Sequence, residues 1–469
     1  MKTKMKMKRL IITIILAISV AMLFGVFVGC SGSSSIEGVR FSRVATGSHE
    51  WGSSLAIDRD GNLWEWRNVT YRGSGCASVR YSTAFTQIMV GTDFTNGQIS
   101  VGGNHSLAID RNGNLFAWGN NAQGQLGDRT TRNQANPVQI IEGTRFIDVS
   151  AGLHFSLAVD VNGGIWAWGR NSNGQVGCGS GSALVSRQII PIRLDIPNVH
   201  FVSVSAGGNH SLALDNEGNI WGWGNNFNGQ VGDNAEYLNF VLADEHLDED
   251  GEAITSRDRS DRDAPVRLET SVVFTQVSAG NNHSLALDIN GNVWAWGQNS
   301  SLQLGIQDPC HPILCGNEVS SENLICSCPV YEMVNNVLTN TGEGGRLRRT
   351  LRNRYAPKRV LIRNGYVDLT ITSIDAGNSH SMAIDTNGNL WGWGENGRSG
   401  RLGNGGTEPG RVPVLASFNQ STNVVLVSAG HSHTMSIDAL GNLWTWGSNP
   451  GGTIGGGVEE MVLSPKKLT

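Results

Sequence analysis

Residues 201–233 read FVSVSAGGNHSLALDNEGNIWGWGNNFNGQVGD, and residues 274–305 repeat this pattern as FTQVSAGNNHSLALDINGNVWAWGQNSSLQLG. In the first copy, Leu212 and Leu214 alternate with small or polar residues, and large and small residues alternate again over residues 220–224. Alternation with a period of two predicts half-buried β-strands. Each copy therefore contains two predicted strands that follow each other closely in the chain.

A short polar sequence separates these two strands. It reads DNEGN at residues 215–219 and recurs as DRNGN, DINGN and DTNGN, which supplies the glycine and asparagine that a tight hairpin with positive φ requires. One more strand is expected before the pair, ending at residues 204–207, and another after it, over residues 265–268 with a proline at its start. Four short strands per copy are typical of a β-propeller blade.

The chain contains seven copies of the pattern, each anchored by an aspartate directly before the hairpin: Asp58, Asp110, Asp160, Asp215, Asp288, Asp385 and Asp438. Adjacent anchors lie 52, 50, 55, 73, 97 and 53 residues apart, so two insertions interrupt an otherwise regular period. We therefore predict an all-β fold, a seven-bladed β-propeller of four-stranded blades over residues 41–469. Inserted loops are expected at about residues 233–263 and 306–358, and the protein is expected to be a monomer.

The composition agrees with a turn-rich β fold. The 469 residues include 61 glycines and 14 tryptophans, and only 16% are charged, which favours many tight turns around an apolar core over disorder. All tryptophans except Trp51 occupy the paired slot of the repeat. In that slot Trp221 and Trp223 project from one face of the strand, while Gly222 and Gly224 leave the other nearly flat. We expect both tryptophans of a blade to be buried at a blade interface, against these glycines of the neighbouring blade.

The N-terminus has the features of a targeting segment. A positively charged head precedes an apolar run over residues 10–28, and a serine- and glycine-rich stretch follows, which predicts a signal peptide over residues 1–29. The sequence FVGC at residues 27–30 resembles a bacterial lipobox, so we expect Cys30 to be lipidated and residues 30–40 to form a linker. The alternative is an N-terminal transmembrane anchor, since the run is almost long enough to span a bilayer. Both readings predict an exported protein at the cell membrane or cell surface.

The recurring pattern AG-x-x-HSLAlD-x-x-GN-l-W-x-WG-x-N-x-x-GQ-l-G resembles the regulator-of-chromosome-condensation repeat, and the resemblance covers almost everything from Phe41 to Leu468. It implies a seven-bladed disc, which agrees with the number of copies. Kelch repeats share the period but place a double glycine and a lone tryptophan differently. Some members of the resembled family are guanine-nucleotide exchange factors for small GTPases, and some secreted relatives resemble inhibitors of β-lactamases.

The repeated histidines and aspartates raise the question of a metal or catalytic site. Packed sheets stand about 10 Å apart, whereas a zinc ion needs its ligands within about 2 Å of one point. Phe155 stands in the third copy where His210 stands in the fourth. Phenylalanine can replace a histidine that packs but not one that binds a metal, so the repeated position favours a packing role. Each aspartate precedes a hairpin, where a carboxylate accepts backbone N–H bonds. We therefore predict no catalytic residue, no metal, no cofactor and no enzymatic activity.

The two insertions carry what distinguishes this chain from a plain repeat. Both follow the GQVG or LQLG loop, so they should emerge as two arms on one face of the propeller. The first arm is acidic and the second ends in a basic run. Calcium binding by the first is a weaker alternative to a solvated loop, because Arg257 stands where an EF-hand needs its closing glutamate. The candidate partner-binding residues are Asp244, Glu245, Asp248, Glu249, Asp250, Glu252, Arg346, Arg348, Arg349 and Arg352.

The second arm also contains a cluster of cysteines. If Cys30 is lipidated, six cysteines remain. The arm is too small to form a hydrophobic core of its own, so in an oxidising location disulfides are favoured. Zinc is the alternative, although a Cys-x-Cys ending is not the usual spacing. The cluster and its disulfide candidates are Cys310, Cys315, Cys326 and Cys328.

These observations together favour a binding scaffold. A propeller offers a rigid frame with variable loops, so a protein partner bound at the cell surface through the loops of one face is the first prediction. The resemblance makes exchange activity on a small GTPase the main alternative, with inhibition of a secreted enzyme as another. The net charge of −5 offers no chain-wide basic footprint, so nucleic acid is not an expected partner.

Overall fold

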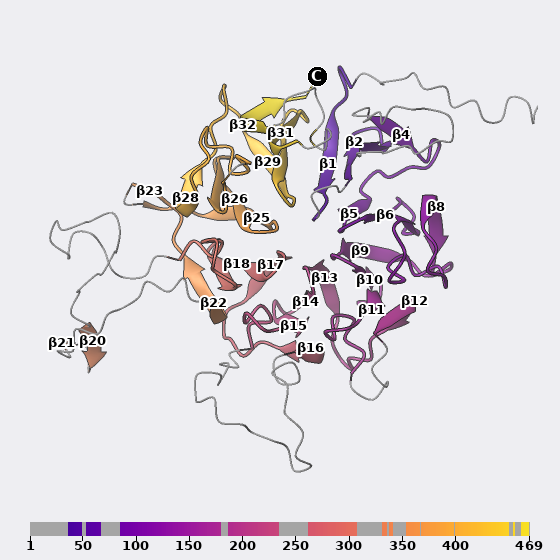
Figure 1. The fold of residues 1–469 in the computed structure, drawn as a ribbon, viewed down its shortest axis with the longest axis horizontal. Coiled ribbons are helices and arrows are strands. Elements are labelled where there is room, and N and C mark those ends of the chain that lie inside the picture. The colour runs from indigo at the N-terminus through magenta and orange to yellow at the C-terminus, as the bar shows by residue number, and fades with distance from the viewer. Residues whose placement is uncertain are drawn as a thin grey trace, which may run out of the picture. The chain divides into compact units, whose positions relative to one another are not determined.

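A computed structural model describes residues 36–48, 53–66, 85–179, 186–233, 261–306, 331–334, 337–340, 353–365, 367–397, 399–449, 454 and 461–468. Residues 35–469 form one compact unit. In it, seven four-stranded antiparallel sheets are arranged as blades around a central opening (Figure 1). Every secondary-structure element in the described residues is a β-strand. The predicted all-β fold and the seven blades are confirmed.

The first four blades follow the first four copies of the repeat, one blade to a copy. Blade 1 comprises β1 (Phe41–Thr46), β2 (Ser54–Asp58), β3 (Leu63–Trp66) and β4 (Thr86–Ile88). Blade 2 comprises β5 (Gln98–Val101), β6 (His105–Ile109), β7 (Leu115–Gly119) and β8 (Gln134–Ile140). Blade 3 comprises β9 (Phe146–Ala151), β10 (Phe155–Asp160), β11 (Ile165–Arg170) and β12 (Arg187–Arg193). Blade 4 comprises β13 (Phe201–Ala206), β14 (His210–Asp215), β15 (Ile220–Gly224) and β16 (Arg262–Arg267).

The last three blades complete the ring, and two short hairpins lie outside the blades. Blade 5 comprises β17 (Phe274–Ala279), β18 (His283–Asp288), β19 (Val293–Gly297) and β22 (Arg354–Val360). Blade 6 comprises β25 (Ile371–Ala376), β26 (His380–Asp385), β27 (Leu390–Gly394) and β28 (Gly410–Leu415). Blade 7 comprises β29 (Val424–Ala429), β30 (His433–Asp438), β31 (Leu443–Ser448) and β32 (Met461–Lys467). The hairpins pair β20 (Tyr331–Val334) with β21 (Val337–Asn340) and β23 (Arg363–Asn364) with β24 (Val367–Asp368).

The first strand of each blade lies at the central opening and the fourth lies at the rim (Figure 1). The rim strand carries the predicted proline, Pro265 in blade 4, at the point where its register with β15 shifts between Gly222 and Gly224. Proline cannot donate to a strand ladder, so an edge strand with an irregular register is where it fits. The predicted proline in the fourth strand therefore agrees with the position of that strand at the rim.

The hydrophobic core runs through the seams between blades. One buried cluster joins Phe155 and Leu157 of blade 3 to Val204 and Trp223 of blade 4, all with at most 6% exposed surface. Equivalent clusters recur at other seams. Each blade thus completes the core of its neighbour, which explains why a single copy of the repeat would not be stable alone.

The ring closes between blade 7 and blade 1 without exchange of strands. The Phe41 N–H donates to the Gly441 carbonyl at 2.8 Å, and the Thr46 N–H donates to Ser428 Oγ at 3.0 Å. Side-chain contact between the hydroxyls of Thr46 and Ser428 adds a further bond of 2.9 Å. In the described residues, the first and last blades therefore meet through packing and hydrogen bonds.

Candidate partner-binding face

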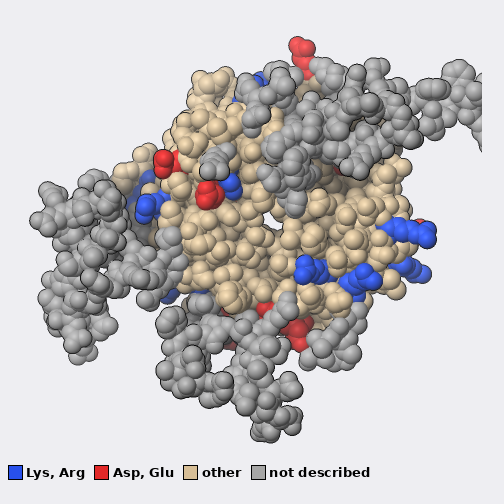
Figure 2. All heavy atoms as spheres, in the orientation of Figure 1, with Lys and Arg blue, Asp and Glu red and all other residues tan. Residues whose placement is uncertain are grey.

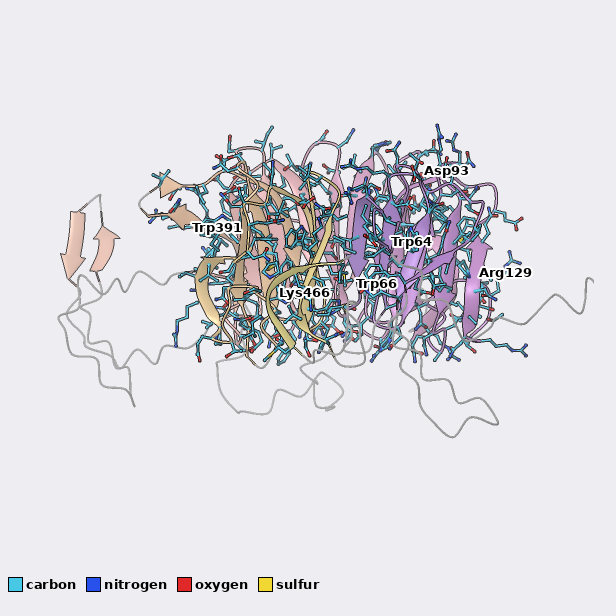
Figure 3. All side chains as sticks on the ribbon, turned by 90° about the horizontal axis from the view of Figure 1, so that it is seen from above. Trp64, Trp66, Asp93, Arg129, Trp391 and Lys466 are labelled. Atoms are coloured by element: carbon cyan, nitrogen blue, oxygen red, sulfur yellow. The ribbon has the colours of Figure 1, made fainter. Side chains whose placement is uncertain are left out.

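The strand order within a blade gives the propeller two faces. Because the strands are antiparallel, the loops after the first and third strands open on one face, and the hairpin after the second strand opens on the other. In blade 4 the first set is residues 207–209 and 225–233, and the hairpin is residues 216–219. We call the first the arm face and the second the turn face. Arg129 lies toward the arm face and Asp93 toward the turn face (Figure 3).

The turn face is built on the seven repeated aspartates. In blade 4, Asp215 Oδ1 accepts hydrogen bonds from the N–H groups of Glu217 and Asn219 at 3.0 and 2.9 Å, and Oδ2 accepts one from Trp221 Nε1 at 3.0 Å. Burial acts to raise the pKa of Asp215, but these hydrogen bonds outweigh it and lower the pKa. The two backbone bonds recur at the other six aspartates. Their predicted role in fixing the hairpins is confirmed.

The repeated histidines link neighbouring blades. His210 Nε2 lies 3.0 Å from Ser284 Oγ of blade 5, and that hydroxyl donates to the Gln230 carbonyl at 2.7 Å. Because the serine has a single hydrogen to give, the histidine is the donor between the two. Burial lowers the pKa of His210 to about 3, so the ring is neutral at physiological pH. Phe155 packs in the same slot of blade 3 with no exposed surface, which confirms a structural role.

The GQ loop forms a clasp onto the next blade. The backbone carbonyl of Gln175 in blade 3 accepts hydrogen bonds from Ser211 Oγ at 2.8 Å and from Trp223 Nε1 at 2.9 Å, both in blade 4. The corresponding carbonyls of four other blades accept the same pair of bonds; these are the carbonyls of Gln125, Gln230, Gln303 and Arg401. The clasp accounts for the recurrence of this loop without any ligand.

The prediction about tryptophans and glycines is wrong in two details. The glycine beneath Trp223 is Gly177 of the GQVG loop, where a Cβ would lie 2.8 Å from Trp223 Nε1, whereas a Cβ on Gly222 would meet Val231 of its own blade. Trp221 is only half-buried, bonds to its own blade and packs edge-on against Phe201 at 5.7 Å between ring centroids. In five blades the second tryptophan bonds to the clasp carbonyl of the preceding blade. The first tryptophan varies in burial, because Trp391 and Trp444 are 8% and 1% exposed, and Trp221 packs against the seam cluster from its half-buried position.

The loop after the third strand has a hydrogen-bonded base, seen in its short form in blade 2. The Asn121 N–H donates to Asn133 Oδ1 at 2.9 Å, and Asn121 Nδ2 donates to Asp128 Oδ1 at 2.8 Å. Residues 129–132 lie between these anchors. Thr130 also belongs to this base, because its carbonyl accepts a hydrogen bond from Asn121 Nδ2 at 3.0 Å and its N–H donates to Asp128 Oδ1 at 2.9 Å.

Blade 4 has the same base around the first arm. The Asn226 N–H donates to Asp261 Oδ1 at 3.3 Å, and Asn226 Nδ2 donates to Asp233 Oδ1 at 3.0 Å. An ion pair between Asp233 and Arg262 adds to it. Residues 234–260 thus occupy the place that residues 129–132 have in blade 2.

The base of the second arm contacts the loop of blade 4. The Asn299 N–H donates to Asn353 Oδ1 at 3.2 Å, which is the same closure in blade 5, and Asn353 Nδ2 donates to Asn228 Oδ1 of blade 4 at 3.0 Å. The bases of the two arms therefore lie together on the arm face, as expected from their position in the repeat.

The predicted site residues themselves lie outside the described residues. This holds for the lipidation site Cys30, for every predicted partner-binding residue and for the cysteine cluster. The lipidation of Cys30, partner binding by the arm residues and a disulfide in the second arm therefore all stay predictions. Cys178 lies in the described part, where its sulfur accepts a hydrogen bond from Asn171 Nδ2 at 3.3 Å. It takes the place of Asp128 and Asp233 in the loop base of blade 3.

Sequence reasoning missed a group of arginines on the arm face, at the seam of blades 2 and 3. This basic patch comprises Arg129, Arg132, Arg170 and Arg187, of which Arg170 is half-buried and the others are exposed. Figure 2 shows Lys and Arg side chains gathered over this part of the face, to the right of the central opening. One signal was available: Arg170 directly follows WAWG, where the fourth to seventh copies have Asn, Gln, Glu or Ser.

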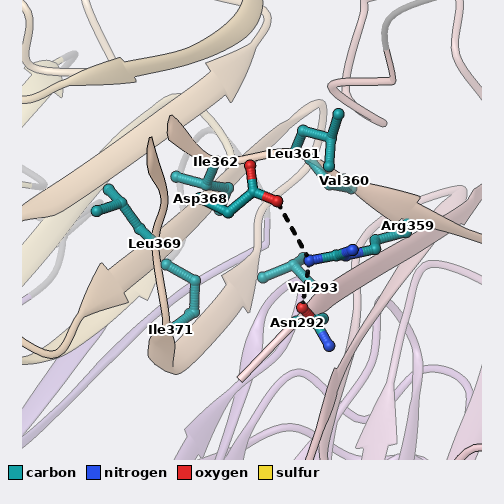
Figure 4. Close-up of a pocket in the computed structure, with 9 residues that line it drawn as sticks. All are labelled: Asn292, Val293, Arg359, Val360, Leu361, Ile362, Asp368, Leu369 and Ile371. Atoms are coloured by element: carbon teal, nitrogen blue, oxygen red, sulfur yellow. Dashed lines mark hydrogen bonds and ion pairs between the residues drawn. The ribbon is translucent and has the colours of Figure 1, made fainter. Parts of the chain in front are cut away.

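The turn face holds two small cavities. In the first, Arg359 Nη2 donates to Asn292 Oδ1 at 2.6 Å and lies 3.6 Å from Asp368 Oδ2 (Figure 4), and the space of about 10 Å³ suits a single water. The second, of about 200 Å³, lies at the connector from blade 3 to blade 4, and its lining includes Arg193, Asp195 and Asn198. The polar side chains of the first cavity are bonded to one another, so that cavity offers no group directed at a ligand.

In the described part of the chain, no group of three or more His, Cys, Asp or Glu side chains is placed to hold a metal ion. Within the same residues, no helix has the length and hydropathy needed to cross a bilayer.

Comparison with known proteins gives relatives across most of the chain. The ultraviolet-B receptor UVR8 of Arabidopsis thaliana is 26% identical over 389 residues, which are 78% of this chain and 80% of that protein. The E3 ubiquitin-protein ligase HERC2 of Homo sapiens is 24% identical over 77% of this chain, but the match spans only 7% of HERC2. Ligase activity can therefore not be inferred for this chain from its similarity to HERC2.

Solved structures and a family model complete the comparison. Human WBSCR16 is 20% identical with a TM-score of 0.61 over 86% of this chain and 88% of that one. Prp20p of Saccharomyces cerevisiae, reported with its binding to Gsp1p and histones, is 22% identical with a TM-score of 0.59 over 84% and 82%. These likenesses show the fold, and the model described as RCC1-like domain matches residues 75–469. The chain therefore belongs to the RCC1-like domain family.

Proposed function

We propose that this protein is an interaction scaffold that holds a protein partner on its arm face, at the cell surface, tethered through a lipid on Cys30. One observation carries the proposal: the third-strand loop keeps the same hydrogen-bonded base in blades 2 and 4 while its content changes from residues 129–132 to residues 234–260. A fixed frame with exchangeable tips is how rigid scaffolds carry binding residues.

The other parts of the repeat support this choice of face. The repeated aspartates, histidines and second tryptophans make the hydrogen bonds and packing contacts of the hairpins and seams. They are therefore not available to distinguish one partner from another. The relatives point to binding in general, since UVR8 is named a receptor and Prp20p is reported with two protein partners. Exchange activity on a GTPase has only this fold-level support, and an exported protein would not meet a cytosolic GTPase.

The test replaces arm content and leaves the base intact. In one variant residues 234–260 become a four-residue Gly-Ser-Ser-Gly loop, and in another Arg346, Arg348 and Arg349 become alanine. We expect capture of partners from the cells of origin, after crosslinking on intact cells, to weaken at least about tenfold while thermal melting stays unchanged. Undiminished capture by both variants would place the binding site elsewhere. Replacing the exposed residues 408 and 409, in the third-strand loop of blade 6, by Gly-Ser is the matched loop control.

The tether is tested separately at Cys30. Cys30→Ala should abolish labelling of the protein by a fatty-acid analogue and move it from the membrane fraction to the soluble exported fraction. Continued membrane association without labelling would favour the transmembrane alternative, and undiminished labelling would show that the lipid is elsewhere.

A further inference from the structure

The arginines of the basic patch come from three segments that meet at one seam. Arg170 and Arg187 are direct cross-strand partners in the register of β11 and β12. Arg129 joins them because its N–H donates to the carbonyl of Ile189, two residues beyond Arg187, at 3.2 Å. Arg132 follows in the same short loop. The patch therefore combines a strand pair of blade 3 with the loop tip of blade 2.

This arrangement opposes the stability of the fold. Like charges directly opposite each other on neighbouring strands are destabilising. The guanidinium groups are also held by neutral acceptors: Arg187 Nη1 donates to the Ala122 carbonyl at 3.3 Å and Arg170 Nε donates to Ser172 Oγ at 2.8 Å. Among the described residues, no carboxylate forms an ion pair with either of them.

The acidic residues around the patch are engaged in loop bases. Asp128 accepts hydrogen bonds from Asn121, Thr130 and Gln134. At the next seam, Asp261 accepts bonds from Asn173 and Asn225 at 2.9 and 3.0 Å. These carboxylates are bonded to amide and hydroxyl donors of the loop bases and form no ion pair with the patch, so the positive charge of the patch remains available to a partner.

The chemistry of the patch selects its ligand. Guanidinium groups offer planar forks of N–H donors that match carboxylates in pairs. The arginines are spread over two blades, which suits an extended chain and not a small anion. We infer that the basic patch binds an acidic segment of a protein, rich in Asp and Glu. This inference rests on the arm face being the binding face and adds the chemistry of the partner.

The test measures binding of a fluorescently labelled ten-residue oligo-glutamate peptide to the full chain by anisotropy. Arg170→Gln combined with Arg187→Gln should weaken binding at least about fivefold and lower its salt dependence. The matched control is Arg59→Gln combined with Arg145→Gln, which removes the same charge from exposed arginines of the turn face. It should leave binding within about twofold of wild type.

Several outcomes would overturn the inference. Equal losses in both double variants would mean general electrostatic attraction. Tighter binding of a single-stranded oligonucleotide of equal charge, lost in the patch variant, would mean a phosphate polymer is the ligand. Peptide binding seen only after residues 234–260 are replaced would mean that the acidic arm of this chain occupies the patch. Peptide binding at the patch together with undiminished partner capture by the arm variants would leave the inference standing and would show that the arms are not the partner-binding part of the arm face.

Discussion

At the scale of single residues, one position of the first strand, at the inner wall of the ring, accepts a hydrogen bond from the next blade and differs in residue type between blades. In most blades a serine of the first strand accepts an N–H from the next blade, as Ser205 Oγ does from Ala279 at 2.9 Å. In blade 6 this place holds Asp375, whose Oδ2 accepts the Ala429 N–H at 2.7 Å. Burial raises the pKa of Asp375 to about 6, against which its hydrogen bonds act only in part.

Asp375 should make the fold less stable at neutral pH than at acidic pH. Its pKa is higher in the folded state than the ordinary 3.8, so its stabilising contribution is present at low pH and is lost as the pH rises through about 6. Relative to wild type, Asp375→Ser should therefore gain about 1 kcal/mol between pH 5 and pH 7.5.

Urea unfolding of both proteins at the two pH values measures this gain. The buried histidines, such as His210 with its pKa lowered to about 3, make the fold more stable as the pH rises. Because both proteins contain these histidines, the difference between the two free energies of unfolding removes their contribution. Asp148, buried with a pKa raised to about 6, is also common to both proteins. A difference that does not change with pH would show that Asp375 is already accommodated as a charged group.

At the scale of elements, the sequence predicts strands and hairpins better than it predicts seams. Period-two alternation and the Asp-to-Asn hairpin motif are local, so β14, β15 and the turn between them follow from residues 210–224 alone. The clasp is different, because its acceptor is the backbone carbonyl of Gln175, and a carbonyl has no sequence signature. For the same reason the half-buried Trp221 could not be told from the fully buried Trp223 by pattern.

Two glycines of blade 3 separate packing from backbone strain in the clasp. Gly177 has φ of 81° and no room for a Cβ beneath Trp223, whereas Gly179 has φ of 76° and open space around it. Gly179→Ala should cost about 1 kcal/mol from the left-handed backbone alone. Gly177→Ala should cost about 2 kcal/mol more, because the indole must move from its bond to Gln175.

Chemical unfolding of the two alanine variants gives the comparison directly. Loss of the tryptophan's buried fluorescence signature in Gly177→Ala, but not in Gly179→Ala, would locate the effect at Trp223. Equal destabilisation of the two variants would mean that the clasp packs more loosely than its distances indicate.

At the scale of the whole molecule, counting repeats predicted seven blades and the side of the propeller on which the bases of both arms lie. It did not predict the basic patch, because Arg129 and Arg187 lie far apart in sequence and meet only when blades 2 and 3 pack. It also did not show how the ring closes, since residues at the two ends of the chain carry no pattern that relates them. Contacts between copies are therefore the part of the fold that a repeat pattern leaves open.

The seam between blades 7 and 1 should open before the others, because no connector joins these blades covalently. Its inner bonds run from Thr46 to Ser428, whereas the equivalent bond from Ala279 to Ser205 lies between blades that a connector also holds. Ser428→Ala should therefore speed amide hydrogen exchange in β1 and β29 about tenfold through local opening. Ser205→Ala, which removes the same kind of bond, should change exchange in β13 and β17 by less than about threefold. Equal acceleration at the two seams would show that hydrogen bonds and core packing, and not the covalent connectors, set the stability of every seam in the ring.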